Sequence, residues 1–142
     1  DGRDIEDIYE IRIRVEGLAA RRAAERATGE QLAELKRVLD MQEFFTFKED
    51  SDSIIDADNQ FHDMLYRLSG SLVLYDTLSP LHRKIVRYRK VCVRHGGRAK
   101  ESYAEHKAIY EAIAAHDPDK AEELLLRHTV NARNSIRSLG ED

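Results

Sequence analysis

Apolar residues recur every three to four positions along almost the whole chain, and this spacing constrains the fold more than any other feature. Such a period places apolar side chains along one face of an α-helix, whereas a half-buried strand requires strict alternation. We therefore predict an all-α protein. Its helices are expected at about residues 4–27, from Thr28 toward Phe45, from Ser51 or Asp52 to Leu68, at 72–95, at 99–116, and from Asp117 to Leu139.

Local signals support several of these helix ends. Residues 28–31 have the spacing of a capping box. Asp117 followed by Pro118 is typical of an N-cap with proline at the first helical position. Pro80 predicts a kink within residues 72–95, because the proline ring removes a backbone hydrogen bond.

The length and residue usage are those of one helical domain over residues 1–142. Cys92 is the single cysteine and cannot form an internal disulfide, so a cytoplasmic location is expected. The longest apolar runs are far shorter than the roughly 18 residues of a membrane span. Because the chain lacks an initiator methionine, we expect it to be part of a longer protein.

The charge of the chain argues against direct binding of nucleic acid. The formal net charge is −4, whereas phosphate binding requires a clustered basic surface. Residues 83–100 are a local exception, because they contain many lysines and arginines and no acid. We interpret this stretch as a solvated helix face; the alternative is that one arginine turns inward toward an anionic ligand.

Four side chains of metal-binding type interrupt the predicted apolar faces: Asp58, His62, His106 and His128. Asp58 and His62 are four residues apart and share one helix face. His106 and His128 are equally distant in sequence from Asp117, the turn of a predicted helical hairpin, so their imidazoles should face each other. Buried ionisable groups are unfavourable unless they are paired or bind a metal. The sequence therefore predicts one metal site formed by all four.

The chemistry of these ligands suits zinc, with nickel, manganese, cobalt or iron as alternatives. A lone histidine on an apolar face is more often a hydrogen-bonded core residue, but three together with an aspartate favour a metal. The other histidines, His82, His95 and His116, lack this pattern and are expected to face solvent.

The role of the metal remains open at this point. Four protein ligands around a tetrahedral ion would form a structural site, whereas an octahedral ion would leave positions for a small molecule. An enzyme would also need a base near such a position. The candidates Glu101, Glu105 and Asp63 lie outside the inward stripes.

Four motifs occur along the chain: Tyr9-Glu10-Ile11-Arg12 through Glu16, Asp58-x-x-Phe61-His62, Glu105-His106 with Ile109 and Ala112-Ile113, and Ala121 to His128. The residues of these motifs and their order along the chain resemble those of the FadR-type C-terminal effector (FCD) domain of GntR-family transcription regulators. The resemblance covers nearly the whole chain. It implies an antiparallel bundle of six to seven helices that dimerises and binds a metal and a small carboxylate or sugar acid.

The resemblance also implies further properties of the protein. Metal-binding members use an aspartate and three histidines, which correspond here to Asp58, His62, His106 and His128. An N-terminal winged-helix domain, absent from this chain, would bind operator DNA in the full-length protein.

Four residues are candidate contacts of the acid. Arg12 interrupts the apolar stripe of the first helix, and its guanidinium can hold a carboxylate by two hydrogen bonds. Ser102 resembles a pocket hydroxyl of the family. Arg89 and Asn131 are further candidates, because Arg89 shares a stripe with apolar residues and Asn131 is close to His128 in sequence. For each arginine the alternative is a surface ion pair.

We therefore predict a non-enzymatic, metal-containing ligand sensor that regulates transcription. The alternatives are a small helical-bundle metalloenzyme and a purely structural metal bundle.

Overall fold

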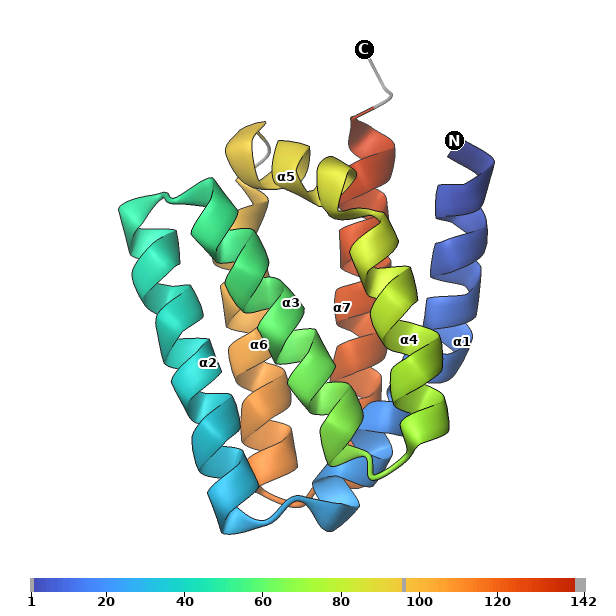
Figure 1. The fold of residues 1–142 in the computed structure, drawn as a ribbon, viewed down its shortest axis with the longest axis vertical. Coiled ribbons are helices and arrows are strands. Elements are labelled where there is room, and N and C mark those ends of the chain that lie inside the picture. Colours follow the sequence, from blue (N-terminus) through green and yellow to red (C-terminus); the bar gives the residue numbers. More distant parts are fainter. Residues whose placement is uncertain (1, 96, 140–142) are drawn as a thin grey trace.

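The computed structural model describes residues 2–95 and 97–139, and the described residues form helices without any strand, as predicted. The helices are α1 (Gly2–Arg26), α2 (Gly29–Lys48), α3 (Ser51–Leu68), α4 (Leu72–Lys84), α5 (Val86–His95), α6 (Arg98–Ala114) and α7 (Pro118–Ser138). Figure 1 shows the long helices lined up side by side as a bundle, with the short α5 lying across one end. None of these helices is long and apolar enough to cross a membrane.

The packing of the helices brings distant parts of the sequence together. α1 packs along α7, α2 packs against α3 and α6, and α6 packs against α7 (Figure 1). α5 contacts α3, α6 and α7, so it covers the end of the bundle at which α1 begins. The faces of α3, α6 and α7 that carry the predicted metal ligands therefore point into the bundle beneath α5.

Most of the predicted helix boundaries are confirmed. Thr28 accepts a hydrogen bond from the backbone of Gln31, whose side chain bonds back to Thr28, and this completes the predicted capping box. Asp117 caps α7, with Pro118 in the first turn, as expected. The N-terminal cap predicted for α3, Ser51 or Asp52, was wrong by one or two residues. Asp50 is the N-cap, because its carboxylate accepts hydrogen bonds from both the backbone and the hydroxyl of Ser53.

The predicted helix 72–95 is two helices in the structure. Pro80 lies inside α4, and the chain leaves helical geometry at Ile85 (φ −108°, ψ 18°), between α4 and α5. The interruption therefore falls one turn after the proline. This position matters for the site, because α4 continues past Pro80 and carries His82 into the interior.

The core consists of two apolar clusters. The larger contains alanines of α1 and leucine, isoleucine and aromatic side chains of α2, α3, α4, α6 and α7. The smaller lies under α5 and contains Ile8, Tyr9, Ile85, Cys92 and Ile136. Three members of the smaller cluster, Tyr9, Cys92 and Ile136, also line a cavity that reaches the histidines.

Candidate metal and effector site

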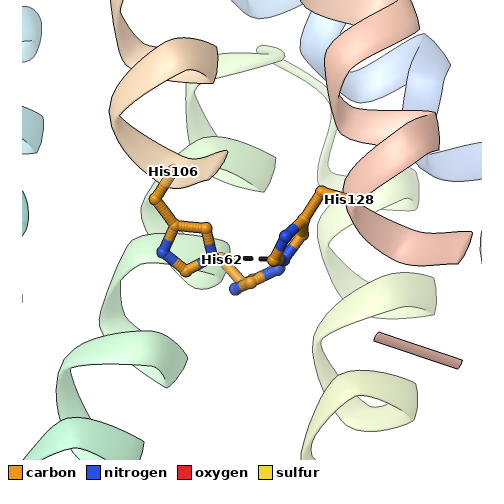
Figure 2. A group of neighbouring side chains, drawn as sticks. All are labelled: His62, His106 and His128. Carbon is orange, nitrogen blue, oxygen red and sulfur yellow. Dashed lines mark hydrogen bonds between the residues drawn. The ribbon is translucent and has the colours of Figure 1, made fainter. Parts of the chain in front are cut away.

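Three histidine side chains converge inside the bundle. His62 from α3, His106 from α6 and His128 from α7 point toward one another (Figure 2), and they offer ligand atoms that all lie within 4.8 Å of one another. The Nε2 atoms of His106 and His128 are 3.2 Å apart. All three side chains are buried. The structure thus brings His106 and His128 face to face, as the symmetry of the α6–α7 hairpin about Asp117 indicated.

Hydrogen bonds fix which nitrogen of each ring is available. His106 Nδ1 donates to Gln42 Oε1 (2.7 Å), and His128 Nδ1 donates to Glu105 Oε1 (2.6 Å). His62 Nδ1 donates to the backbone carbonyl of Asp58 (3.0 Å). Because Nδ1 is the donor in each of these bonds, Nε2 is the nitrogen of each ring that can offer a lone pair to a metal. A hydrogen-bonded Nδ1 and a free Nε2 are the usual arrangement of histidines that bind a metal.

The spacing of these lone pairs fits a divalent ion. Two lone pairs that face each other repel unless a cation lies between them, and His62 Nε2 is buried without a hydrogen-bond partner. With metal–nitrogen distances of about 2.0–2.1 Å, tetrahedral coordination places two nitrogens about 3.3 Å apart. The observed 3.2 Å between His106 and His128 Nε2 agrees with this requirement.

Asp58 lies beside this group and forms a second set of possible metal ligands with His62 and His82, whose ligand atoms also lie within 4.8 Å of one another. Its Oδ1 lies 3.1 Å from His62 Nδ1 and 3.5 Å from His106 Nε2. Its Oδ2 accepts a hydrogen bond from Arg89 and lies 3.6 Å from His82 Nε2. Burial alone would raise the pKa of Asp58, but Arg89, His62 and His82 together outweigh burial, and the pKa is well below its usual value. Asp58 is therefore ionised and can act as a metal ligand.

The protonation states of the surrounding groups also suit a metal. Burial lowers the pKa of His128, and lowers that of His106 well below its usual value, so both rings are neutral near pH 7. Burial opposes ionisation of Glu105, but hydrogen bonds from His128 and Arg98 lower its pKa to about 2. Glu105 is therefore a carboxylate that accepts the hydrogen bond from His128 Nδ1. This bond holds the imidazole in its orientation.

A cavity of about 40 Å³ lies beside the histidines, and its walls include Tyr9, Arg12, Gln42, Asp58, His62, His82, Arg89, Cys92, Ser102 and His128. Among the described residues, six of the buried polar atoms without a hydrogen-bond partner belong to residues of this wall: Tyr9 Oη, Arg12 Nη1, Gln42 Nε2, His62 Nε2, His82 Nδ1 and Arg89 Nε. Buried polar groups are normally hydrogen-bonded, and several of these atoms are donors. The wall therefore favours a ligand rich in acceptor oxygens.

Three of the four predicted acid contacts, Arg12, Ser102 and Arg89, line this cavity. Arg12 is fully buried, and its Nε donates to Glu16 Oε1 at 2.5 Å, while its Nη1 has no partner. Glu16 also accepts hydrogen bonds from Tyr66 and Thr129, each at 2.8 Å. Arg12 is thus held in place by a buried carboxylate and keeps one donor for a ligand.

The predicted acid contacts Arg89 and Asn131 have different surroundings. Arg89 lines the cavity, but its guanidinium already bonds to Asp58, to Asn59 Oδ1 (2.7 Å) and to the His82 carbonyl (3.1 Å). The ion pair anticipated for Arg89 exists, but it is buried rather than on the surface. Asn131 is not part of the cavity wall, and its amide donates to Glu105 Oε2 at 2.9 Å. It supports the carboxylate that orients His128.

The sequence did not predict several residues of the site. His82 was expected to face solvent, but it is 1% exposed and stacks on His62 with ring centroids 3.8 Å apart. The expectation was wrong because α4 continues through Pro80, so His82 stays on the inward face of the helix. The heptad-like spacing of Leu78, His82, Ile85 and Arg89, all of them buried, was the available signal. His95 and His116 are exposed, as expected.

Glu105 and Gln42 were also overlooked. Glu105 was placed outside the inward stripe, yet it is half-buried and bonds to His128, Asn131 and Arg98. Gln42 is fully buried and follows the apolar stripe of α2, one turn after Val38 and Leu39. A glutamine at such a position signals a buried hydrogen-bond partner.

Comparison with known proteins identifies the class. A family model described as the FCD domain matches residues 7–131, and the chain belongs to this family. The chain is an effector domain of the kind found in GntR-family transcription regulators, which confirms the resemblance noted in the sequence.

Individual relatives agree with this assignment. The chain is 25% identical over 132 residues to the HTH-type transcriptional repressor RspR of Escherichia coli (strain K12), a match that covers 93% of this chain and 58% of RspR. It is 28% identical over 142 residues to the galactonate operon transcriptional repressor of the same organism, covering 98% of this chain and 60% of the relative. Both relatives are named as transcriptional repressors.

A solved structure shows the same fold. Streptococcus agalactiae GntR superimposes with a TM-score of 0.82 and 25% sequence identity, over 94% of this chain and 59% of that one. The chain thus spans less than two thirds of the length of these proteins.

Proposed function

We propose that this domain senses a small carboxylic or sugar acid at a divalent metal ion and thereby controls DNA binding by an N-terminal winged-helix domain of the full-length regulator. Asp58 and the Nε2 atoms of His62, His106 and His128 would hold the ion, with zinc as the first choice and nickel, manganese, cobalt or iron as alternatives. When bound, the ion supplies positive charge for a carboxylate oxygen of the acid.

One observation carries this proposal: a single cavity is lined both by three of the four candidate metal ligands, Asp58, His62 and His128, and by buried donors without partners. A purely structural metal site would need no such wall. Arg12 offers its free Nη1, and Ser102 adds a hydroxyl to the same wall. One relative is named for the galactonate operon, and galactonate is a sugar acid.

The regulator is proposed to act as a homodimer, because an operator with two half-sites matches a two-fold symmetric protein. Large apolar side chains are exposed on α1 and α4, and we propose that these two helices form the interface. These side chains are Ile11 (43% exposed) and Leu18 (39%) on α1, and Leu72 (78%) and Val73 (76%) at the start of α4. α1 and α4 also contact each other, so these faces belong to neighbouring elements.

Acid binding measured with and without the metal tests the proposal. Zinc-loaded protein should show a raised melting temperature with at least one member of a panel of organic and sugar acids, since a ligand of the native state stabilises it by mass action. Calorimetry of that acid should show binding that is lost after chelation and restored by zinc. Equal affinity in the metal-free protein would mean that the acid does not bind at the metal, and a panel without any binder would contradict the sensor function.

A further inference from the structure

We propose that Tyr9, Arg12, His82 and Arg89 form a second anchoring subsite in the cavity and that the effector is a short dicarboxylic acid, bound by the metal at one end and by this subsite at the other. The inference rests on the proposed function of the same site. It goes further because it assigns the acid two anionic groups and gives roles to Tyr9 and His82.

The cavity has two chemically different sides, and Asp58 marks the division. Asp58 Oδ1 is on the side of His62 and His106, whereas Oδ2 is on the side of Arg89 and His82. His82 comes from α4 and Arg89 from α5, whereas the three converging histidines come from α3, α6 and α7. His82 also forms a second group of possible metal ligands with Asp58 and His62, so equal zinc content in His82→Phe is needed to assign it to the subsite.

α1 supplies the rest of the second side. The Arg12 guanidinium carbon lies 4.9 Å from the centre of the Tyr9 ring, and both residues line the cavity. All four members of the subsite are at least nine-tenths buried, with exposures of 0% for Tyr9, 1% for Arg12, 1% for His82 and 8% for Arg89. Each has one side-chain nitrogen or oxygen without a partner. Such a set is unfavourable without a ligand, because buried polar groups normally have hydrogen-bond partners.

The number of these donors exceeds what a single carboxylate can satisfy. A carboxylate bound to a metal through one oxygen has only its remaining lone pairs for hydrogen bonds. A carboxylate has about four lone pairs, so three remain, and the unpartnered donor atoms of Tyr9, Arg12 and Arg89 would occupy all of them. Gln42 Nε2 is a fourth donor and exceeds them. A second acceptor group on the ligand would allow both sets of interactions to form together.

The balance of buried charge points to an anionic second group. Arg12 is neutralised by Glu16, and Arg98 by Glu105. Asp58 is then the carboxylate that must balance both Arg89 and a divalent ion, which leaves an excess of two positive charges. A dicarboxylate cancels this excess, whereas a monocarboxylate leaves a buried charge uncompensated, which is strongly unfavourable.

The size of the cavity favours a short acid. A volume of about 40 Å³ has room for only a few water-sized groups, so acids of three or four carbons fit better than six-carbon sugar acids.

Calorimetry with matched acids tests the inference. Zinc-loaded protein is titrated with malonate, succinate and L-malate, and with the monoacids propionate and L-lactate. The diacids should bind about tenfold or more tightly than the monoacids, which is the effect of one additional charge-assisted hydrogen bond. Tyr9→Phe and His82→Phe should each lower the ratio of succinate to lactate affinity. Both replacements keep an aromatic ring, so His82→Phe should preserve the packing on His62.

Tyr103→Phe is the matched control, because Tyr103 is outside the cavity and its hydroxyl bonds to Glu43. It should leave the ratio unchanged, and elemental analysis should show equal zinc in every variant. Monoacids that bind as tightly as diacids would overturn the second subsite while leaving the proposed function intact. An unchanged ratio in both Tyr9→Phe and His82→Phe would also overturn it. Absence of binding by every acid, including sugar acids, would contradict the proposed function itself.

Discussion

Replacement of Arg12 by methionine should destabilise the fold strongly, in addition to any effect on acid binding. Arg12 and Glu16 are each 1% exposed, and methionine keeps most of the buried side-chain volume but removes the charge. Glu16 would remain buried with only the hydroxyl groups of Tyr66 and Thr129 as donors. The expected consequence is an uncompensated carboxylate between α1, α3 and α7.

The magnitude follows from the burial of the pair. Removal of one partner of a buried ion pair costs about 3–5 kcal/mol. For a chain of this length the unfolding entropy corresponds to about 0.3 kcal/mol per degree, so the melting temperature should fall by about 10–15 °C. The double variant Arg12→Met with Glu16→Gln should regain at least about half of this loss, because no charge remains unpaired.

Urea denaturation followed by circular dichroism, on metal-free protein, measures both variants against the wild type. A loss below about 1 kcal/mol in the single variant would refute the reasoning. A double variant that is no more stable than the single one would refute it equally. If the double variant is folded, acid binding can be measured on it. A loss of affinity then reflects the missing Arg12 contact and not unfolding.

Three further predictions follow from the contacts around the site. Gln42→Leu and Glu105→Gln should each weaken zinc binding about 10–100-fold, measured by competition with a chromophoric chelator, because these side chains orient His106 and His128. Burial opposes ionisation of Glu16, but the charge of Arg12 and the hydrogen bonds from Arg12 and Thr129 together lower its pKa. Its contribution to stability is therefore present above the ordinary pKa of 4.5 and is lost as the pH falls below it. Urea denaturation between pH 3 and 7, a range of about four units around that value, should show a smaller pH dependence in Glu16→Gln. Ile11→Glu combined with Leu18→Glu should convert the proposed dimer to a monomer in light scattering, and a wild type that is monomeric at high concentration would contradict the interface.

Local patterns were sufficient to predict much of the site. His106 and His128 were paired correctly because two helices joined by a tight turn keep residues equidistant from the turn at the same height. Asp58 and His62 were placed together because four residues make about one helical turn. Both inferences need only short-range geometry, which is what a single sequence contains.

The remaining residues depend on contacts between distant elements. His82 reaches the site because α4 continues through Pro80 and ends only at Lys84. Glu105 lies at the edge of its helix face and is drawn inward by Arg98 and by Asn131 from α7. The Arg12–Glu16 pair was visible as a four-residue spacing, but its burial follows from the packing of α1 against α3 and α7, which periodicity alone does not determine.

Metal content is the most direct test of the central claim, that Asp58 and three converging histidines bind a divalent ion. Wild-type protein loaded with zinc and freed of excess should retain about one ion per chain in elemental analysis. His106→Ala and His128→Ala should lose most of it, whereas His116→Ala, which alters an exposed histidine, should retain it. Equal zinc in all four proteins, or none in the wild type, would contradict the account.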